Sequence, residues 1–466
     1  MLAKLAGDVA ARRVSAVRLV NEALGRVAAR DPDLNAVVAL RRDEALAEAA
    51  VLDRQLTDGA APGPLCGLPL LVKDLEDVTG MVTTAGSLLF AQHPPATRDS
   101  RTVQRLRAAG AIVVGKANLP EFATEGYTSN LLFGTTGNPW APQWSPGGSS
   151  GGSAAALAAG MVPLATATDG GGSVRIPAAF CGLLGIKPTR GVVGRRPIHD
   201  WLDLSTDGPL ATTVADLELL LRLLAGPEPG DAEAVGLDVS DRGPVTAVYA
   251  AHRTADLAAL PPDVVRVFEA AVGAMADILG LRVRWLDPAT VFEGINPDHD
   301  WFTLATADHV ASLGREWVVE GRPRMHPGAA EFMSQGLDVD IDGYLAARRR
   351  RHDHTRRLDG LLGAAAILLT PTVAATGWLA DGRLDADSEP AALPQSCYST
   401  AMQNLTGHPA ISLPAGRLTT GVPFGLQVTG PRFADILLLS VARAWEAAYP
   451  WPQSAPGHSP FHDLEG

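Results

Sequence analysis

The sequence has few cysteines, few lysines and no long apolar segment. Three cysteines, widely separated and odd in number, predict neither a disulfide framework nor a zinc site. The least polar window, about residues 153–168, contains Gly160 and Pro163 and is too short to span a bilayer. We therefore expect no membrane span, no structural metal and no disulfide. The cysteines are Cys66, Cys181 and Cys397.

Charge and composition exclude further classes of protein. Residues 1–20 carry charged side chains without an apolar core, so they do not resemble a signal peptide. The formal net charge of -12 argues against a nucleic-acid-binding surface. With 46% hydrophobic and 19% charged residues, the chain has the composition of an ordinary globular protein. We expect it in the cytoplasm, bound to neither nucleic acid nor membrane.

Lysine is scarce among the basic residues. Only four of the 39 basic side chains are lysines. Arginine keeps its proton under protein conditions, whereas a buried lysine can lose it. Each lysine is therefore worth examining as a proton acceptor. They are Lys4, Lys73, Lys116 and Lys187.

Apolar spacing typical of helices alternates with short apolar runs along the whole chain. This alternation predicts an α/β fold around a large, partly parallel sheet. We expect helices over about 3–29 (two, with Ser15 as a cap), 43–57, 100–109, 152–160, 213–225, 262–279, 340–358 and 432–447. We expect strands over about 67–74, 111–118, 161–169, 246–250, 282–286, 365–370 and 422–428.

Two segments rich in glycine and serine stand out, "SPGGSSGGS" (145–153) and "DGGGS" (169–173). A phosphate-binding loop would require a lysine after its last glycine, and neither segment contains one. A near match over 110–116 has four apolar strand formers between its glycines and Ala117 where a magnesium-binding hydroxyl is needed. Both observations argue against a nucleotide site.

An acyl-transfer site explains the second segment better. Such a site needs a nucleophilic hydroxyl, a base and N–H donors for an oxyanion. Glycines 170–172 let backbone N–H groups converge beside Ser173, since no Cβ obstructs them. No histidine lies close in sequence, but Lys73 ends an apolar strand and can be neutral there. An ion pair of Lys73 with Asp74, Glu76 or Asp77 is the open alternative.

Taken together, these segments resemble the amidase signature family, hydrolases with a Ser–cis-Ser–Lys triad. The resemblance is carried by "SPGGSSGGSAAALAAGMVPLATATDGGGSVRIPAAFCGLLGIKPTRG", by "GLPLLVKDLEDVTG" upstream, and by "LLTPT", "NLTGHPAISLPAG" and "GVPFGLQVTGPRFADILLL" downstream. It extends over nearly the whole chain, to about residue 448.

The resemblance implies roles for individual residues. Ser173 matches the nucleophile, Lys73 the general base, and Ser149 the serine that relays the proton after a cis peptide bond at Gly148. Asp169 and Arg175 are expected to shape the loop. The oxyanion hole is expected from the N–H groups of Gly170, Gly171, Gly172 and Ser173.

Further positions match the substrate pocket of relatives, with core packing as the alternative for their side chains. Substrate-binding positions are Ala123, Thr124, Gly126 and Tyr127, to which we add Phe133, the 315–340 region, Cys397, Thr400 and Gln403. Gly170 stands where many relatives have a bulkier residue, which predicts a looser loop or a wider pocket. Roles in turns, capping or the core are expected for Ser145, Ser150, Ser153 and Cys181. Two positions are equally expected for His199, Asp200 and Asp203: beside the substrate pocket, or in a solvated loop.

The resemblance also implies the architecture and the activity. We expect a single large domain over 1–466, with a mixed central β-sheet flanked by α-helices. Its parts would be N-terminal helices (about 1–60), a catalytic core (about 65–225), a variable pocket-lining region (about 226–360) and a C-terminal sheet and helix (about 361–450).

The expected reaction is hydrolysis of small to medium apolar or aryl amides, without metal or cofactor, by a protein that can form a homodimer. Carbamate (urethane) or ester hydrolysis is one alternative. A role as an amidotransferase subunit is another, but "STDGPL" (205–210) lacks the residues expected for that role. A non-catalytic scaffold would not need Ser173, Ser149 and Lys73 together.

Overall fold

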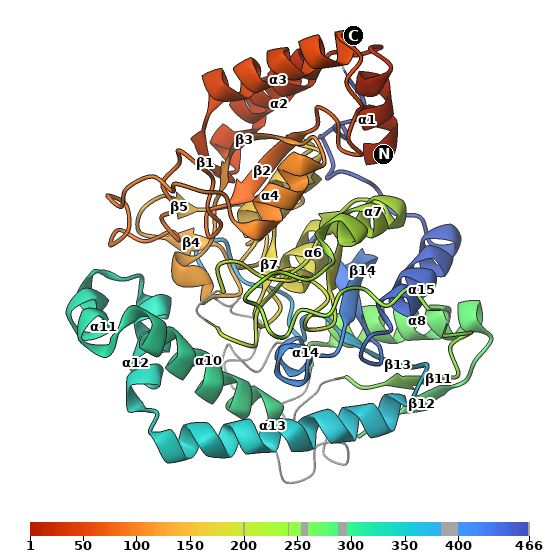
Figure 1. Ribbon diagram of the computed structural model, residues 1–466. Helices are drawn as coiled ribbons and strands as arrows, with labels where there is room; N and C mark the ends of the chain where they lie inside the picture. Colours follow the sequence, from red (N-terminus) through yellow and green to blue (C-terminus); the bar gives the residue numbers. More distant parts are fainter. Residues whose placement is uncertain (199–200, 241, 253–259, 288–295, 384–398, 465–466) are drawn as a thin grey trace.

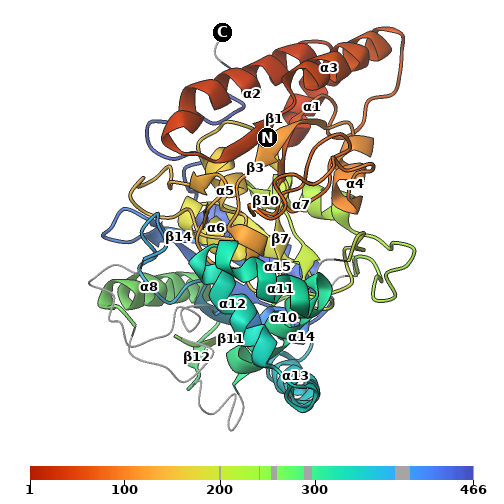
Figure 2. The same ribbon diagram turned by 90° about the vertical axis from the view of Figure 1, so that its left-hand side faces the viewer.

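The computed structural model describes residues 1–198, 201–240, 242–252, 260–287, 296–383 and 399–464. It confirms the predicted α/β class, with mixed sheets at the centre and helices around them (Figure 1). Helices α1 (Leu2–Ala10), α2 (Ala16–Arg30) and α3 (Arg42–Thr57) lie at one end, near both termini (Figures 1 and 2). No helix in these ranges is long and apolar enough to cross a membrane.

A four-stranded sheet carries Lys73. Its order is β1-β3-β2-β6, with β2 parallel to both neighbours and β1 antiparallel to β3. Every residue of β2 and β3 is buried, as their unbroken apolar runs predict. Helix α2 starts at the predicted cap, where the Ser15 side chain accepts from the Arg18 N–H. The strands are β1 (Val37–Leu40), β2 (Pro69–Lys73), β3 (Ile112–Ala117) and β6 (Leu164–Ala165).

A separate seven-stranded mixed sheet lies in the other half of the molecule. Only β11 pairs in parallel, with β12 and β13, and the remaining pairs are antiparallel. Helices α6 (Arg175–Cys181), α8 (Pro262–Leu279) and α15 (Asp435–Ala448) pack on it. In order, its strands are β10 (Leu210–Ala211), β8 (Leu184–Lys187), β14 (Ala410–Arg417), β15 (Pro423–Thr429), β13 (Ala366–Pro371), β11 (Ala247–Ala250) and β12 (Val283–Trp285).

The strand expected over 161–169 is two short strands. Residues 164–165 form β6 in the small sheet, and β7 (Thr168–Asp169) pairs with β9 (Thr206–Asp207) in a sheet of its own. The chain thus passes between sheets just before the three glycines. The other short elements are α4 (Arg101–Ala108), α5 (Gly151–Ala158), α7 (Val214–Leu224), α14 (Ala401–Thr406), β4 (Ser129–Asn130) and β5 (Gly134–Thr135).

Four helices after residue 296 form a group of their own. Helices α10 (Pro297–Leu313), α11 (Arg315–Gly321), α12 (Pro327–Asp338) and α13 (Ile341–Leu362) lie at the end opposite to α1–α3 (Figures 1 and 2). Sequence periodicity predicted only α13. Helix α10 was not predicted, because it buries polar side chains as well as apolar ones and its sequence therefore lacks the apolar period of a helix.

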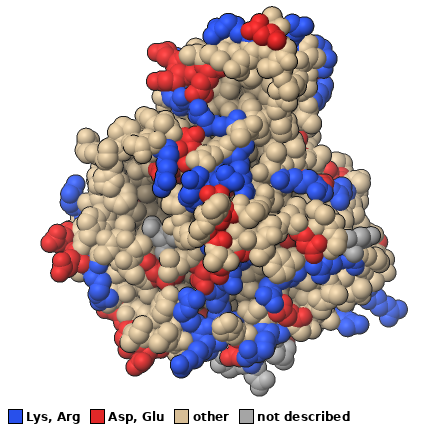
Figure 3. Space-filling model, viewed as in Figure 1, with Lys and Arg blue, Asp and Glu red and all other residues tan. Residues whose placement is uncertain are grey.

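Acidic and basic side chains are interspersed over the surface shown in Figure 3. Neither sign dominates this face, so it presents no extended field of the kind that attracts a polyanion.

Candidate active site

The segment with Ser173 runs from β7 into α6. Gly172 adopts a φ of +129°, a conformation that favours glycine. This turn lets Ser173 reach the wall of a cavity while only 7% of its surface is exposed. The backbone N–H of Ser150 donates to the Ser173 carbonyl over 3.2 Å. The two Gly/Ser segments therefore lie side by side.

Lys73 approaches the same point from the small sheet. It is the last residue of β2 and is fully buried. Its Nζ lies 2.7 Å from Ser149 Oγ and 2.8 Å from Thr168 Oγ1. Its backbone N–H donates to Thr166 Oγ1 over 2.9 Å, which fixes the end of the strand. Sequence analysis did not single out either threonine.

Burial lowers the pKa of Lys73 from 10.5 to about 7, because the ammonium form loses its hydration. The negative charges of Glu76, Asp169 and Asp207 oppose this shift only in part. At neutral pH a large fraction of Lys73 is thus uncharged. A neutral amine in contact with a hydroxyl can accept its proton.

The alternative role for Lys73, an ion pair with a neighbouring carboxylate, is taken by another lysine. Lys116 Nζ lies 3.2 Å from Asp74 Oδ1, and both side chains are buried. Lys187 is also buried and donates to the Pro188 carbonyl. Within the described residues, Lys73 forms no ion pair with Asp74, Glu76 or Asp77.

Ser149 follows a cis peptide bond with Gly148, as the resemblance implied. Gly148 has no room for a side chain: a Cβ there would lie 2.6 Å from the carbonyl oxygens of Glu125 and Tyr127. Of the neighbouring serines, Ser145 accepts from the N–H groups of Thr128 and Gly147. Ser150 stands at the N-cap position of α5, but its side chain contacts Thr168 instead of capping the helix.

Hydrogen bonds to the carbonyl groups hold the glycine loop. Trp301 Nε1 donates to the Gly170 carbonyl over 2.8 Å, and the Thr400 hydroxyl donates to that of Gly171 over 2.5 Å. The C=O and N–H of a planar trans peptide point in opposite directions. These bonds therefore turn the N–H groups of Gly171 and Gly172 away from Trp301 and Thr400.

One of the four expected oxyanion donors has a partner already. The Gly172 N–H donates to Asp169 Oδ1 over 2.8 Å. The N–H groups of Gly170, Gly171 and Ser173 form no hydrogen bond with any described residue. The loop thus offers three free donors instead of the four that we expected.

Asp169 and Arg175 shape the loop, as expected. Both are fully buried, and Arg175 donates to both oxygens of Asp169. Asp169 also accepts from the Val174 N–H, which closes the turn around Ser173. Arg175 reaches further, to Gln403, Gln427, Asn404 and the Thr400 carbonyl. These contacts tie the loop to α14 and β15.

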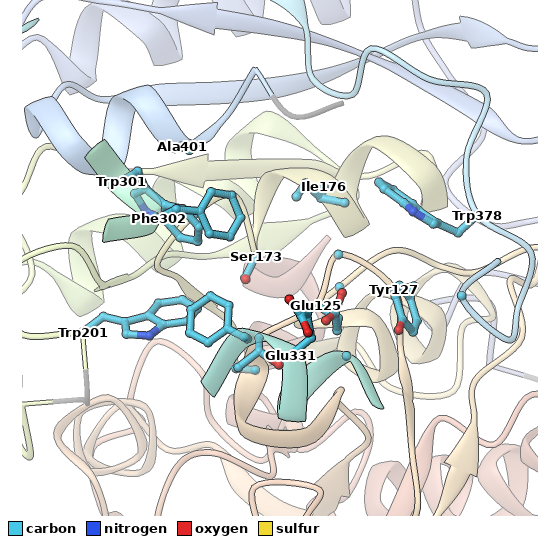
Figure 4. Close-up of a pocket in the computed structure, with 18 of the residues that line it drawn as sticks. Glu125, Tyr127, Ser173, Ile176, Trp201, Trp301, Phe302, Glu331, Trp378 and Ala401 are labelled. Atoms are coloured by element: carbon cyan, nitrogen blue, oxygen red, sulfur yellow. The ribbon is translucent and has the colours of Figure 1, made fainter. Parts of the chain in front are cut away.

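Ser173 lines a cavity of about 310 Å³ between the glycine loop and helices α10 and α12 (Figure 4). The four positions matched to substrate binding all line it. Ser173 and Ser149 also line a smaller hollow of about 30 Å³, which has room for about one water molecule. The cavity is lined by Ala123, Thr124, Glu125, Gly126, Tyr127, Gly148, Gly171, Ser173, Ile176, Trp201, Trp301, Phe302, Gly328, Glu331, Phe332, Gln335, Trp378, Gly382 and Ala401.

Several expectations about the pocket need correction. Phe133 lines a different hollow, beside β1, because its loop turns away from Ser173. Gln403 is buried behind the loop, where it contacts Arg175. Gly170 does not widen the pocket, since a Cβ there would lie 1.9 Å from the Trp201 ring, which fills the space. His199, Asp200 and Cys397 lie outside the described residues.

The remaining expectations have mixed outcomes. Asp203 contacts Arg348 and Arg351 and does not line the cavity. Cys181 is a buried core residue, and burial raises the pKa of its thiol. In the 315–340 region, helix α12 does line the cavity. Within the described ranges, no group of three His, Cys, Asp or Glu side chains could hold a metal ion.

Most of the aromatic wall was not found from the sequence. These residues come from four segments and share no motif: Trp201, Trp301 with Phe302, Phe332 and Trp378. The one signal available was their rarity, since aromatic residues make up 5% of the chain.

Comparison with known proteins gives matches along nearly the whole chain. The family model described as Amidase matches residues 18–439. The putative amidase AmiA2 of Mycobacterium tuberculosis is 35% identical over 475 residues, covering 98% of this chain and 94% of that protein. One of the subunits of the glutamyl-tRNA(Gln) amidotransferase of a Synechococcus strain is 36% identical over 465 residues, covering 93% of each chain.

A solved structure shares this arrangement. The crystal structure of a bacterial aryl acylamidase of the amidase signature family superposes with a TM-score of 0.85 at 27% identity. The match covers 96% of this chain and 95% of the other.

Proposed function

The chain belongs to the amidase family, and on this premise we propose that it hydrolyses apolar or aryl carboxylic amides with Ser173 as the nucleophile. The observation that carries the proposal is the contact of 2.7 Å between Lys73 Nζ and Ser149 Oγ, in a fully buried position behind Ser173. Lys73, whose pKa is lowered by burial to about 7, can supply the base that a serine nucleophile needs.

In the proposed reaction, neutral Lys73 takes the Ser149 hydroxyl proton while Ser149 takes that of Ser173. The Ser173 oxygen attacks the amide carbonyl, and free N–H groups of the glycine loop stabilise the oxyanion. The same relay returns a proton to the leaving amine as the C–N bond breaks. Water then attacks the acyl-enzyme, and its proton passes to Lys73 by way of Ser149. As the ester bond to Ser173 breaks, the same relay returns a proton to Ser173 Oγ.

Two features support an apolar or aryl substrate. Aromatic side chains form much of the cavity wall, and a volume of about 310 Å³ suits a small to medium ligand. The structural relative named above is an aryl acylamidase. The expected substrate-binding positions Ala123, Thr124, Gly126 and Tyr127 all line this cavity, which favours contact with such a ligand.

A panel of anilides, primary amides, carbamates and esters tests the proposal. We expect wild-type protein to hydrolyse anilides with the highest kcat/KM, and Ser173→Ala to lose at least about 10³-fold. A higher kcat/KM for carbamates or esters would contradict the proposed substrate class but not the role of Ser173 as the nucleophile. Full activity of Ser173→Ala would contradict the mechanism. Activity that appears only with a co-purified partner protein would favour an amidotransferase.

A further inference from the structure

The charge inside the cavity is one-sided. Among the described residues that line it, the charged side chains are Glu125 and Glu331, and neither lysine nor arginine is present. Figure 4 shows both carboxylates on the side of the cavity opposite to Ile176 and Ala401, with Ser173 between. Such a lining disfavours an anionic ligand and attracts a cationic one.

Glu125, which is partly exposed, differs from the buried carboxylates of the site in its partners among the described residues. Asp169 is bound by Arg175, Asp74 by Lys116, and Glu121 by the Ser87 hydroxyl. Glu125 forms no hydrogen bond or ion pair with any described residue. Burial alone raises the pKa of its carboxyl to about 7. An unpaired carboxylate in an apolar wall gains free energy when a cation reaches it.

The position of Glu125 is fixed by packing. A Cβ at Gly328, in the first turn of α12, would lie 2.3 Å from Glu125 Oε1, so the carboxyl group rests on this glycine. The carbonyl of Glu125 lies against Gly148, next to Ser149. Glu125 is therefore held close to the reacting groups by the same segment that carries Tyr127.

The surrounding rings suit a cation with an apolar body. Tyr127, Trp301 and Phe332 line the same cavity as Glu125. Aromatic faces attract an ammonium group and also pack against alkyl or aryl carbon. An aromatic wall beside a lone carboxylate therefore recognises an amine that is joined to an apolar chain or ring.

We propose that this cavity selects amides that carry a cationic ammonium group, and that Glu125 is the residue that binds it. The proposal rests on the proposed function, because it names the substrate class of that same site. Glu331, exposed at the mouth, adds a weaker attraction. Other titratable groups close to Glu125 are Tyr127, His326 beside the Tyr127 ring, and Asp381, which is paired with Arg383.

Matched neutral and cationic substrates test the proposal at pH 8, where Glu125 is ionised. One pair is 4-(aminomethyl)acetanilide and 4-ethylacetanilide, with the cation on the leaving amine. The other is the anilide of 6-aminohexanoic acid and that of heptanoic acid, with the cation on the acyl group. In at least one pair we expect kcat/KM to be about tenfold higher for the cationic member, as a desolvated charge pair would give.

The variant Glu125→Gln should reduce this ratio to about 1, because it keeps the shape and removes the charge. Glu331→Gln should reduce it less. Asp277→Asn, on the exposed surface of α8, controls for the change in net charge and should leave the ratio at the wild-type value. A wild-type ratio near 1 in both pairs, or a ratio that Glu125→Gln does not change, would overturn the proposal.

A binding measurement separates this proposal from the proposed function. In calorimetry, Ser173→Ala should bind benzylammonium with a Kd at least about tenfold lower than its Kd for benzyl alcohol. Adding Glu125→Gln to this variant should remove the difference in Kd. Equal binding of the two ligands overturns the proposal even if neutral anilides are hydrolysed. Absence of hydrolysis of every amide overturns the proposed function, while the calorimetry still decides the role of Glu125.

Discussion

Lys73, Lys116 and Lys187 are all buried, but they have different surroundings. Lys116 faces the Asp74 carboxylate and Lys187 a backbone carbonyl, whereas Lys73 faces two hydroxyl groups. Hydroxyl groups stabilise an ammonium ion less than a carboxylate does. Burial therefore lowers the pKa of Lys73 with only distant charges to oppose it.

The first prediction is a pH dependence. For a neutral anilide, kcat/KM should rise with pH, reach half its maximum near pH 7 and stay flat above, because only unprotonated Lys73 accepts a proton. Lys73→Ala should lower kcat/KM by about 10²–10⁴-fold. Steady-state rates between pH 5.5 and 9 measure both.

Glu125 titrates in the same range, so Glu125→Gln is the control for this profile. The rise near pH 7 should persist in that variant if it belongs to Lys73. A profile that is flat in wild-type protein, or that flattens in Glu125→Gln, would show that Lys73 does not act as the base.

At the scale of elements, helix α10 supports the loop that carries Ser173. The Trp301 indole reaches from this helix to the Gly170 carbonyl, and a Cβ on Gly171 would lie 2.4 Å from the same ring. The three glycines are thus required by packing against Trp201, Trp301 and Thr400 as much as by backbone freedom. We therefore expect Trp301 to act as a positioning residue for the Gly171 N–H.

The second prediction concerns this helix. Trp301→Phe keeps a ring but removes the bond to Gly170, so the loop can rotate and misalign its donors. We expect kcat to fall by about tenfold, less than the 10²–10³-fold typical of losing an oxyanion donor outright, with KM changed by less than about threefold. Steady-state kinetics with a neutral anilide measure the two constants separately.

Trp201→Phe is the matched control, because Trp201 lines the same cavity but its Nε1 bonds to none of the described residues. Its effect on kcat should be smaller. Equal losses of kcat in the two variants, or a Trp301→Phe effect confined to KM, would mean that Trp301 contributes only to the cavity wall.

At the scale of the molecule, the site lies where the two sheets meet. The small sheet contributes Lys73, the loop before α5 contributes Ser149, the segment from β7 to α6 contributes Ser173, and Arg175 connects this region to β15 through Gln427. Arg175 and Asp169 are fully buried, and every polar contact of this ion pair is made inside the protein. Removing one partner leaves a buried charge without compensation.

The third prediction follows from this connection. Arg175→Met should lower the free energy of unfolding by about 3–5 kcal/mol, because Asp169 loses its counter-ion. Urea denaturation followed by circular dichroism measures the change. Arg222→Met, which removes an exposed pair with Glu218 on α7, should cost no more than about 1 kcal/mol. If Arg175→Met lowered the free energy of unfolding by less than about 1 kcal/mol, the stabilising role of the Arg175–Asp169 pair would be contradicted.

The sequence predicted the fold class and the residues that come together at the loop, for different reasons. Apolar runs located β2 and β3, and the distinctive Gly/Ser segments pointed to Ser149 and Ser173. The division into two sheets was not predictable, because a run of apolar residues gives no strand partner. Trp301 was missed because its helix α10 buries Asp298, Asp300 and Asp308 and so has no clear apolar period. The homodimer stays a prediction.

The most direct test of the account is covalent labelling of the nucleophile. Wild-type protein is treated with a fluorophosphonate, digested and analysed by mass spectrometry, with Ser173→Ala and Lys73→Ala in parallel. The account predicts a single adduct on Ser173, formed faster as pH rises through about 7, much more slowly in Lys73→Ala and not at all in Ser173→Ala. An adduct on another residue, or equal labelling of Ser173→Ala, would contradict it.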